Sequence, residues 1–173
     1  MKTYRAALIA TLALLAGCSQ EVHYSGAGRL IDKGWADPSS RYVVELGTLD
    51  LTKPGSTTFR IAGLPSAHYV IGVQVPLPAD QGRAADTGTI ADVALQLMRV
   101  PGGQVLIITG PLRSQTWAGR PHEASSFVYR KESYESYFDA EPGDVFELRV
   151  VVNTPDASIP PGSKVVLKSG GWR

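Results

Sequence analysis

Short runs of alternating apolar and polar residues dominate this sequence, and Gly and Pro interrupt them at close intervals. In the clearest run, residues 145–152, the even-numbered positions are all apolar: Phe146, Leu148, Val150 and Val152. Successive side chains of a β-strand point to opposite faces, so this pattern predicts a strand with one buried face. Repetition of such runs predicts an all-β fold, an antiparallel β-sandwich of immunoglobulin-like or related type with about eight short strands.

Further strands are predicted wherever the same alternation recurs: 42–51, 57–61, 68–75, 105–109, 126–130, 164–168 and, as an edge strand, 28–32. In 68–75 one face carries apolar residues and the other, which holds Val70, Gly72 and Gln74, has little polar character either. A strand with two weakly polar faces is expected at a central position in a sheet. In 42–51 the alternation changes parity at Gly47, which indicates a bulge or bend. Pro-Gly pairs at 54–55, 142–143 and 161–162 each precede a predicted strand and suit type II turns.

One segment, residues 89–98, fits two kinds of structure. Ile90, Val93, Ala94, Leu97 and Met98 form a helical stripe, whereas Val93, Leu95 and Leu97 alternate as in a strand. The Pro-Gly-Gly sequence at 101–103 and the apolar residues after it favour a hairpin, so a strand is the preferred prediction.

Composition limits the classes of function. The chain is 43% hydrophobic and 19% charged, which fits a globular domain. We expect one such domain over residues 28–173. Without residues 1–17, which hold Lys2 and Arg5 and no acid, 15 basic residues face 16 acidic ones. That balance argues against a nucleic-acid partner, since such binders carry a basic surface.

The N-terminus reads as an export signal. Lys2 and Arg5 precede an apolar run over residues 6–16 that is too short to span a bilayer. The sequence Leu-Ala-Gly-Cys at 15–18 resembles the lipobox of bacterial lipoproteins, and it contains the chain's single cysteine. The resemblance implies cleavage after residue 17, lipidation of Cys18 with fatty acyl chains such as palmitate, and a tether over residues 18–27. Ser19 after the cysteine implies an outer-membrane, periplasm-facing location by the same resemblance.

Catalytic and metal-binding motifs are not found. Gly-x-Ser-x-Gly and His-Glu-x-x-His do not occur, and Cys18 is assigned to the lipid. The histidines are far apart in the sequence, and the spacing of Asp80, Asp86 and Asp92 matches no EF-hand loop. We therefore expect no enzyme activity, no cofactor and no metal.

Residues 113–138 are the strongest candidate for a binding surface. Tyr, Trp and Arg are enriched at interface hot spots, and this segment gathers them in a stretch with loop character. The candidate partner-binding residues are Trp117, Arg120, Tyr134 and Tyr137. The alternative is that the aromatic residues here are core, which is the preferred interpretation for Trp117, Phe127, Tyr129 and Phe138; for Tyr134, Tyr137 and Arg120 the two interpretations are balanced.

Two regions of the mature part resemble a group of small bacterial lipoproteins of unknown function: residues 49–56 with 69–72, and residues 138–172. The resemblance implies a β-sandwich and no particular activity, and some lipoproteins of this build act as immunity proteins against antibacterial toxins. The expected function is thus non-catalytic binding of a periplasmic protein partner, in an envelope-associated or toxin-immunity role, by a protein joined to the membrane through its lipid. The alternative is a carbohydrate- or peptidoglycan-binding module that uses exposed aromatic rings.

Overall fold

The computed structural model describes residues 23–34, 41–76, 91–111, 114–116, 125–128, 137–159 and 161–170. Within these ranges the chain forms eleven β-strands and no helix. Of the residues singled out by the sequence, Cys18, Trp117, Arg120 and Tyr134 lie outside the described ranges, as do Asp80 and Asp86.

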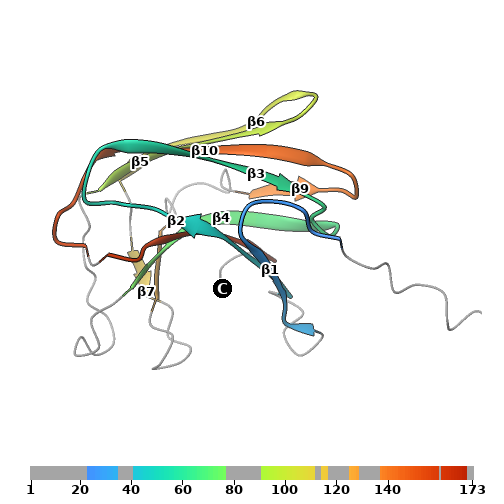
Figure 1. The fold of residues 1–173 in the computed structure, drawn as a ribbon, viewed down its shortest axis with the longest axis horizontal. Helices are drawn as coiled ribbons and strands as arrows, with labels where there is room; N and C mark the ends of the chain where they lie inside the picture. The colour runs from blue at the N-terminus through green and yellow to red at the C-terminus, as the bar shows by residue number, and fades with distance from the viewer. Residues whose placement is uncertain are drawn as a thin grey trace, which may run out of the picture.

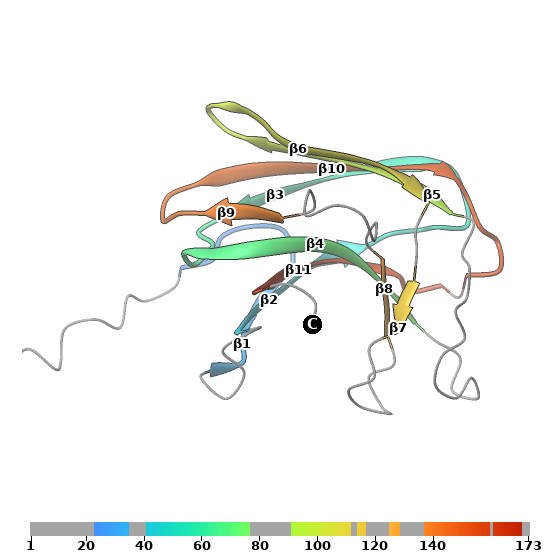
Figure 2. The same ribbon diagram turned by 180° about the vertical axis from the view of Figure 1, so that it is seen from behind.

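The strands form two antiparallel sheets that pack face to face (Figures 1 and 2). The small sheet has the order β3-β10-β5-β6, with bounds β3 Gly55–Ala62, β5 Asp92–Arg99, β6 Gly103–Pro111 and β10 Val145–Thr154. The large sheet has the order β1-β2-β11-β4-β8-β7, with β9 also paired to β4. Its bounds are β1 Arg29–Asp32, β2 Tyr42–Thr48, β4 Ala67–Pro76, β7 Ser114–Thr116, β8 Ser125–Val128, β9 Tyr137–Ala140 and β11 Lys164–Ser169. The predicted all-β sandwich is confirmed, and β7 and β9 are strands that the sequence did not predict.

The core lies between the sheets and follows the predicted alternation. Along β10, the four even-numbered apolar residues 146–152 are at most 2% exposed, whereas Glu147 and Arg149 are exposed. Strand β4 is central, as predicted, since β11 pairs with one of its edges and β8 and β9 share the other. Val70 of β4 and Val166 of β11 alternate with core residues, so they face away from the core, and both are nevertheless buried. The large sheet is therefore covered on both faces at these two positions.

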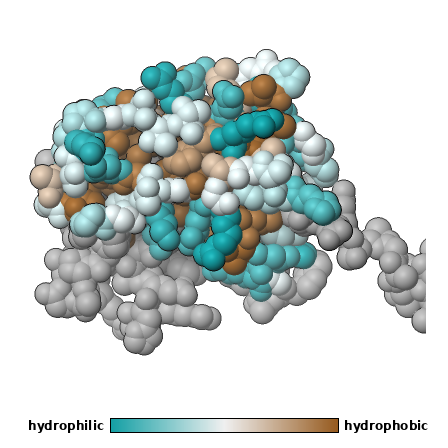
Figure 3. Space-filling model, in the orientation of Figure 1, coloured by the Kyte–Doolittle hydropathy of each residue, from teal (hydrophilic) through white to brown (hydrophobic). Residues whose placement is uncertain are grey.

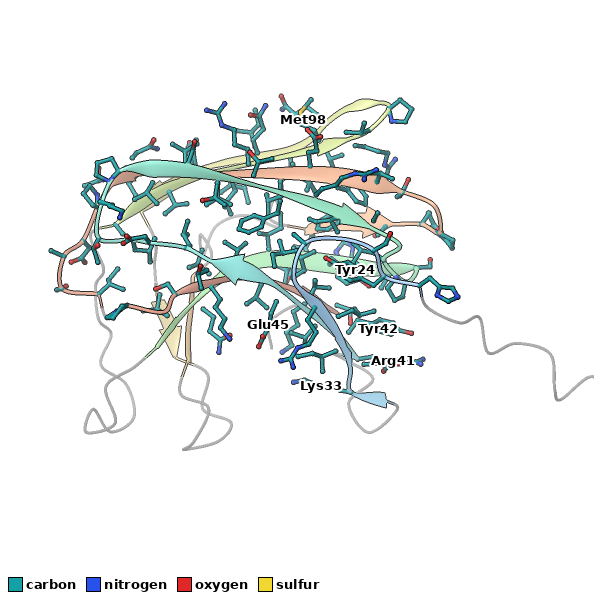
Figure 4. The ribbon with its side chains drawn as sticks, viewed as in Figure 1. Tyr24, Lys33, Arg41, Tyr42, Glu45 and Met98 are labelled. Atoms are coloured by element: carbon teal, nitrogen blue, oxygen red, sulfur yellow. The ribbon has the colours of Figure 1, made fainter. Side chains whose placement is uncertain are left out.

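The described part of the ambiguous segment forms a strand, which begins at Asp92. Strand β5 pairs with β10 on one side and β6 on the other, and these two ladders take up its backbone hydrogen bonds. Val93, Leu95 and Leu97 point into the core, while Met98 lies on the outer side of the small sheet (Figure 4). Long-range pairing therefore decides what local periodicity left open.

The expected irregularity in β2 is present at Gly47. The β2–β11 register shifts between Val165, which faces Gly47, and Val166, which faces Glu45, so one residue of β2 is left over as a bulge. A Cβ at Gly47 would lie 3.0 Å from a ring carbon of the core residue Phe59. A larger side chain would therefore press on the core at this bend.

In two of the three Pro-Gly pairs the glycine has the positive φ that the predicted type II turn requires, and in the third it does not. The turn before β10 closes with a 3.0 Å bond from Asp144 N to Glu141 O, and Gly143 has φ 92, as a type II turn requires. Gly162 likewise has φ 103. The prediction for 54–55 is wrong, because Gly55 already belongs to β3 and the reversal lies earlier, at 50–53. There the Asp50 carboxylate accepts hydrogen bonds from the Thr52 amide and hydroxyl, which replaces the turn chemistry expected of Pro54.

The segment before β1 belongs to the folded domain. Ser25 N and Ala27 N donate to Ala62 O and Arg60 O of β3 at 3.0 and 2.7 Å, although the sequence assigned these residues to a tether. The chain then enters β1, which forms the edge strand predicted there, on the large sheet. Tyr24 packs against the core beside this crossing, its hydroxyl donates to Ala27 O at 2.6 Å, and burial raises its pKa to about 12 (Figure 4).

Candidate binding surface

Of the four predicted binding residues, Tyr137 is the one that the described structure contains. It is the first residue of β9, and its neighbour Phe138 is 3% exposed in the core. Since adjacent strand residues point to opposite faces, Tyr137 faces away from the core, and it is half-buried. The core assignment preferred for Phe138 is confirmed.

Pairing of β9 with β4 brings Tyr137 beside two polar residues. His68 lies opposite Asp139, and Val70 lies opposite Tyr137. The Tyr137 and His68 rings stack with centroids 4.8 Å apart and planes 9° apart. His68 Nδ1 lies 2.7 Å from an Asp139 carboxylate oxygen, and both side chains are more than half exposed. When Nδ1 carries the ring proton and donates to Asp139, Nε2 is the acceptor nitrogen of the neutral imidazole.

An arginine from the other sheet joins this group. Arg99, at the end of β5, donates from Nη2 to Asp139 O at 3.3 Å and pairs with Asp144 Oδ2, also at 3.3 Å. Its guanidinium carbon lies 5.4 Å from the centroid of the Phe146 ring, an attractive cation–π position, and its buried Nε has no hydrogen-bond partner. Arg99 thus ties the small sheet to the β9 edge of the large one.

The turn after β9 adds acidic groups. Glu141 accepts a 3.1 Å hydrogen bond from the Ser66 hydroxyl, and its backbone N–H donates to Asp144 at 2.9 Å. We define the His68 cluster as the following residues: His68, Arg99, Tyr137, Asp139, Glu141 and Asp144. Its three carboxylates outnumber its basic groups even when the His68 ring is counted with Arg99, so the cluster is acidic.

The sequence pointed to Tyr137 and missed the residues around it. Asp139 and Glu141 stand just beyond the candidate segment, and His68, the first residue of the predicted strand 68–75, was not among the candidates. The alternation of Tyr137 and Asp139 with Phe138 and Ala140 is the local trace that β9 leaves in the sequence, and four residues are too few for it to stand out. The pairing of β9 with a strand 70 residues earlier has no local signal, and it is this pairing that assembles the cluster.

The described residues contain no group of three or more His, Cys, Asp or Glu placed to hold a metal ion. Across the same ranges no helix is long and apolar enough to cross a membrane. Comparisons with protein-family models, curated proteins and solved structures found no significant match. The interpretation of the His68 cluster therefore rests on its own geometry.

Proposed function

We propose that this protein is a lipid-anchored β-sandwich of the bacterial envelope that binds a protein partner in the periplasm through its His68 cluster, without catalysis. The lipobox-like sequence at 15–18 supports the anchor on Cys18, with the outer membrane as its destination. Two or more acyl chains would hold the domain stably at the membrane, whereas one gives marginal binding. The role is envelope-associated or one of toxin immunity.

The observation that carries the binding role is the oriented Tyr137 ring among exposed charges. Stacking on His68 fixes one face of the ring, and the β4–β9 ladder fixes its backbone. A tyrosine held in this way loses little side-chain freedom on binding, which is one reason why tyrosine is enriched at hot spots. Because the cluster is acidic, its partner is expected to present Lys or Arg.

The same geometry supports a second candidate, a carbohydrate ligand. A flat aromatic ring beside the Asp139 and Glu141 carboxylates offers a stacking surface together with hydrogen-bond acceptors for hydroxyl groups. Peptidoglycan is the carbohydrate that a periplasmic lipoprotein would meet.

Site-specific photocrosslinking in cells separates these candidates. A photoreactive phenylalanine analogue replaces Tyr137, and the matched control places it at Thr58, an exposed residue of β3. We expect one discrete protein adduct from position 137 and none from position 58. Asp139→Asn and Glu141→Gln should lower its yield, because they remove charge at nearly constant shape.

Three results would count against the proposal. Equal adducts from both positions, or none from either, would contradict protein binding at this cluster. Retention of the purified chain on peptidoglycan sacculi, with loss of retention for Tyr137→Ala, would favour the carbohydrate ligand instead. Continued incorporation of labelled palmitate into Cys18→Ala would contradict the anchor.

A further inference from the structure

The edge strands that the structure describes differ in how they are protected. In the large sheet, β1 has four residues and begins and ends with the charged Arg29 and Asp32, β7 has three residues, and β9, which pairs with β4 alone among the described strands, has four. In the small sheet, β3 is covered at Arg60 and Ala62 by the bonds from residues 25 and 27. Strand β6 is the opposite edge of the small sheet, has nine residues, and pairs with β5 alone among the described strands.

Strand β6 lacks the charged side chains that usually keep a long edge from pairing. Residues 100–112 contain no charged side chain. Val105 and Ile107 are 37% and 47% exposed, and Val100 in the adjoining turn is 44% exposed, so these apolar side chains reach solvent. Apolar atoms reach the surface near the tip of the β5–β6 hairpin (Figure 3). Long, uncharged, apolar edges readily add a further strand.

We propose that β6 pairs with β6 of a second copy of this chain about a two-fold axis at Ile107, the central residue of the strand, which joins the two small sheets into one. In that register Ile107 lies opposite its own counterpart, Val105 lies opposite Thr109, and Leu106 lies opposite Ile108. Aliphatic and β-branched pairs of this kind are favourable across antiparallel strands. Ile107, the most exposed large apolar side chain among the described residues, is then at the centre of the interface.

A bulge sets the limit of the paired segment. The β5–β6 register shifts between Leu97, which faces Leu106, and Met98, which faces Gln104, so Val105 is the extra residue. Bulges terminate regular pairing, and the ladder with the second copy therefore extends over Val105 to Thr109.

The charges of the small sheet do not oppose a second copy in this orientation, because β6 itself carries none. Strand β5 carries Asp92 at one end and Arg99 at the other. A two-fold axis reverses one hairpin relative to the other, so the Arg99 end of one β5 faces the Asp92 end of the other across three strand spacings, about 14 Å, where salt screens the attraction. The outer-face charges of β10, Glu147 and Arg149, lie two strands from β6. At about 4.8 Å per strand they are about 24 Å from their counterparts, which exceeds the Debye length in physiological salt.

Sedimentation of the full chain in detergent tests the proposal. Wild type should dimerise reversibly, and Ile107→Lys should raise the dimer dissociation constant at least about tenfold, because two ammonium groups would meet at the axis. Thr58→Lys is the matched control, since Thr58 is exposed on the opposite edge of the same sheet. It should leave the dissociation constant unchanged. Thermal melting of both variants should stay close to wild type, as expected for exposed sites.

A charge-reversal mixture distinguishes a second copy from any other occupant. Ile107→Lys and Ile107→Glu should each be monomeric alone and should form a mixed dimer together. In addition, Ile107→Cys should oxidise to a covalent dimer, because facing Cα atoms about 4.5–5.5 Å apart suit a disulfide. Wild type and Thr58→Cys serve as controls, because they measure how much disulfide-linked dimer forms through Cys18 alone. A monomeric wild type, unchanged association of Ile107→Lys, or no mixed dimer would each overturn the proposal.

Discussion

Tyr137 and Phe138 are neighbours in β9 with opposite structural roles, and truncating each to alanine separates them. Phe138 is 3% exposed, and its ring stacks on Tyr69 at 5.7 Å and meets Phe146 edge-on at 5.1 Å, both measured between centroids. Tyr137 is half-buried and its ring contacts His68 on the outer face. The expected losses of stability are therefore very different.

The magnitudes follow from these contacts. Phe→Ala in a core costs about 3–5 kcal/mol, and the two ring pairs place Phe138→Ala towards the upper part of that range, at about 4 kcal/mol. Tyr137→Ala loses one partly exposed ring contact, for which about 1 kcal/mol is expected. In a domain of this size each kcal/mol lowers Tm by about 2–4 °C, so Phe138→Ala should lower Tm by about 8–16 °C and Tyr137→Ala by about 2–4 °C.

Thermal melting followed by circular dichroism measures both changes, and partner binding is measured on Tyr137→Ala in parallel. Loss of binding by about 30-fold with nearly unchanged melting is the result expected of an interface anchor. If Tyr137→Ala melts as early as Phe138→Ala, then Tyr137 contributes to packing and the assignment of its outer-face role is wrong.

Two further predictions concern the backbone and pH. Gly143→Ala should lower the unfolding free energy by about 1 kcal/mol, because alanine is strained at φ 92. Gly55→Ala is the control and should not lower it, since Gly55 has no positive φ and no atom lies within 4 Å of an added Cβ. Urea denaturation of both variants measures the difference. Burial raises the pKa of Tyr24 to about 12, so the unfolded chain releases this proton first as pH rises above about 10. Its contribution to stability is present below pH 10 and is lost as pH rises towards 12. Tyr24→Phe should flatten the alkaline fall in Tm, and an unchanged profile would contradict the assignment.

How far the sequence could predict this fold depended on the length of each strand. Strand β10 was evident because eight of its residues, 145–152, repeat one pattern, and the bend at Gly47 was evident because parity changed there. Strand β9 has four residues, too few for a period to stand out, and it is held by pairing with β4 and by burial of Phe138. Residues 89–98 fitted both the helical period and the strand period, and the hydrogen-bonded ladders of β5 to β10 and β6 are what select the strand.

The candidate site was predictable in part for the same reason. Residue type alone marked Tyr137 as a binding residue. His68 comes from β4 and meets Tyr137 and the Asp139 carboxylate only when β9 pairs with β4, and Arg99 comes from β5 and reaches the Asp139 backbone carbonyl only when both sheets have formed. Contacts made across sheets depend on topology, which no single stretch of sequence contains.

The crossing of the N-terminal segment between the sheets also defines how the domain takes up tension. A pull on His23 first reaches the hydrogen bonds of Ser25 and Ala27 to β3, which lie one behind the other along an antiparallel pair. These bonds can part in succession, and the load then passes to the β1–β2 ladder in the opposite sheet. A domain pulled at this end yields at its margin before the force reaches β4 and β10, so its core is protected from that force.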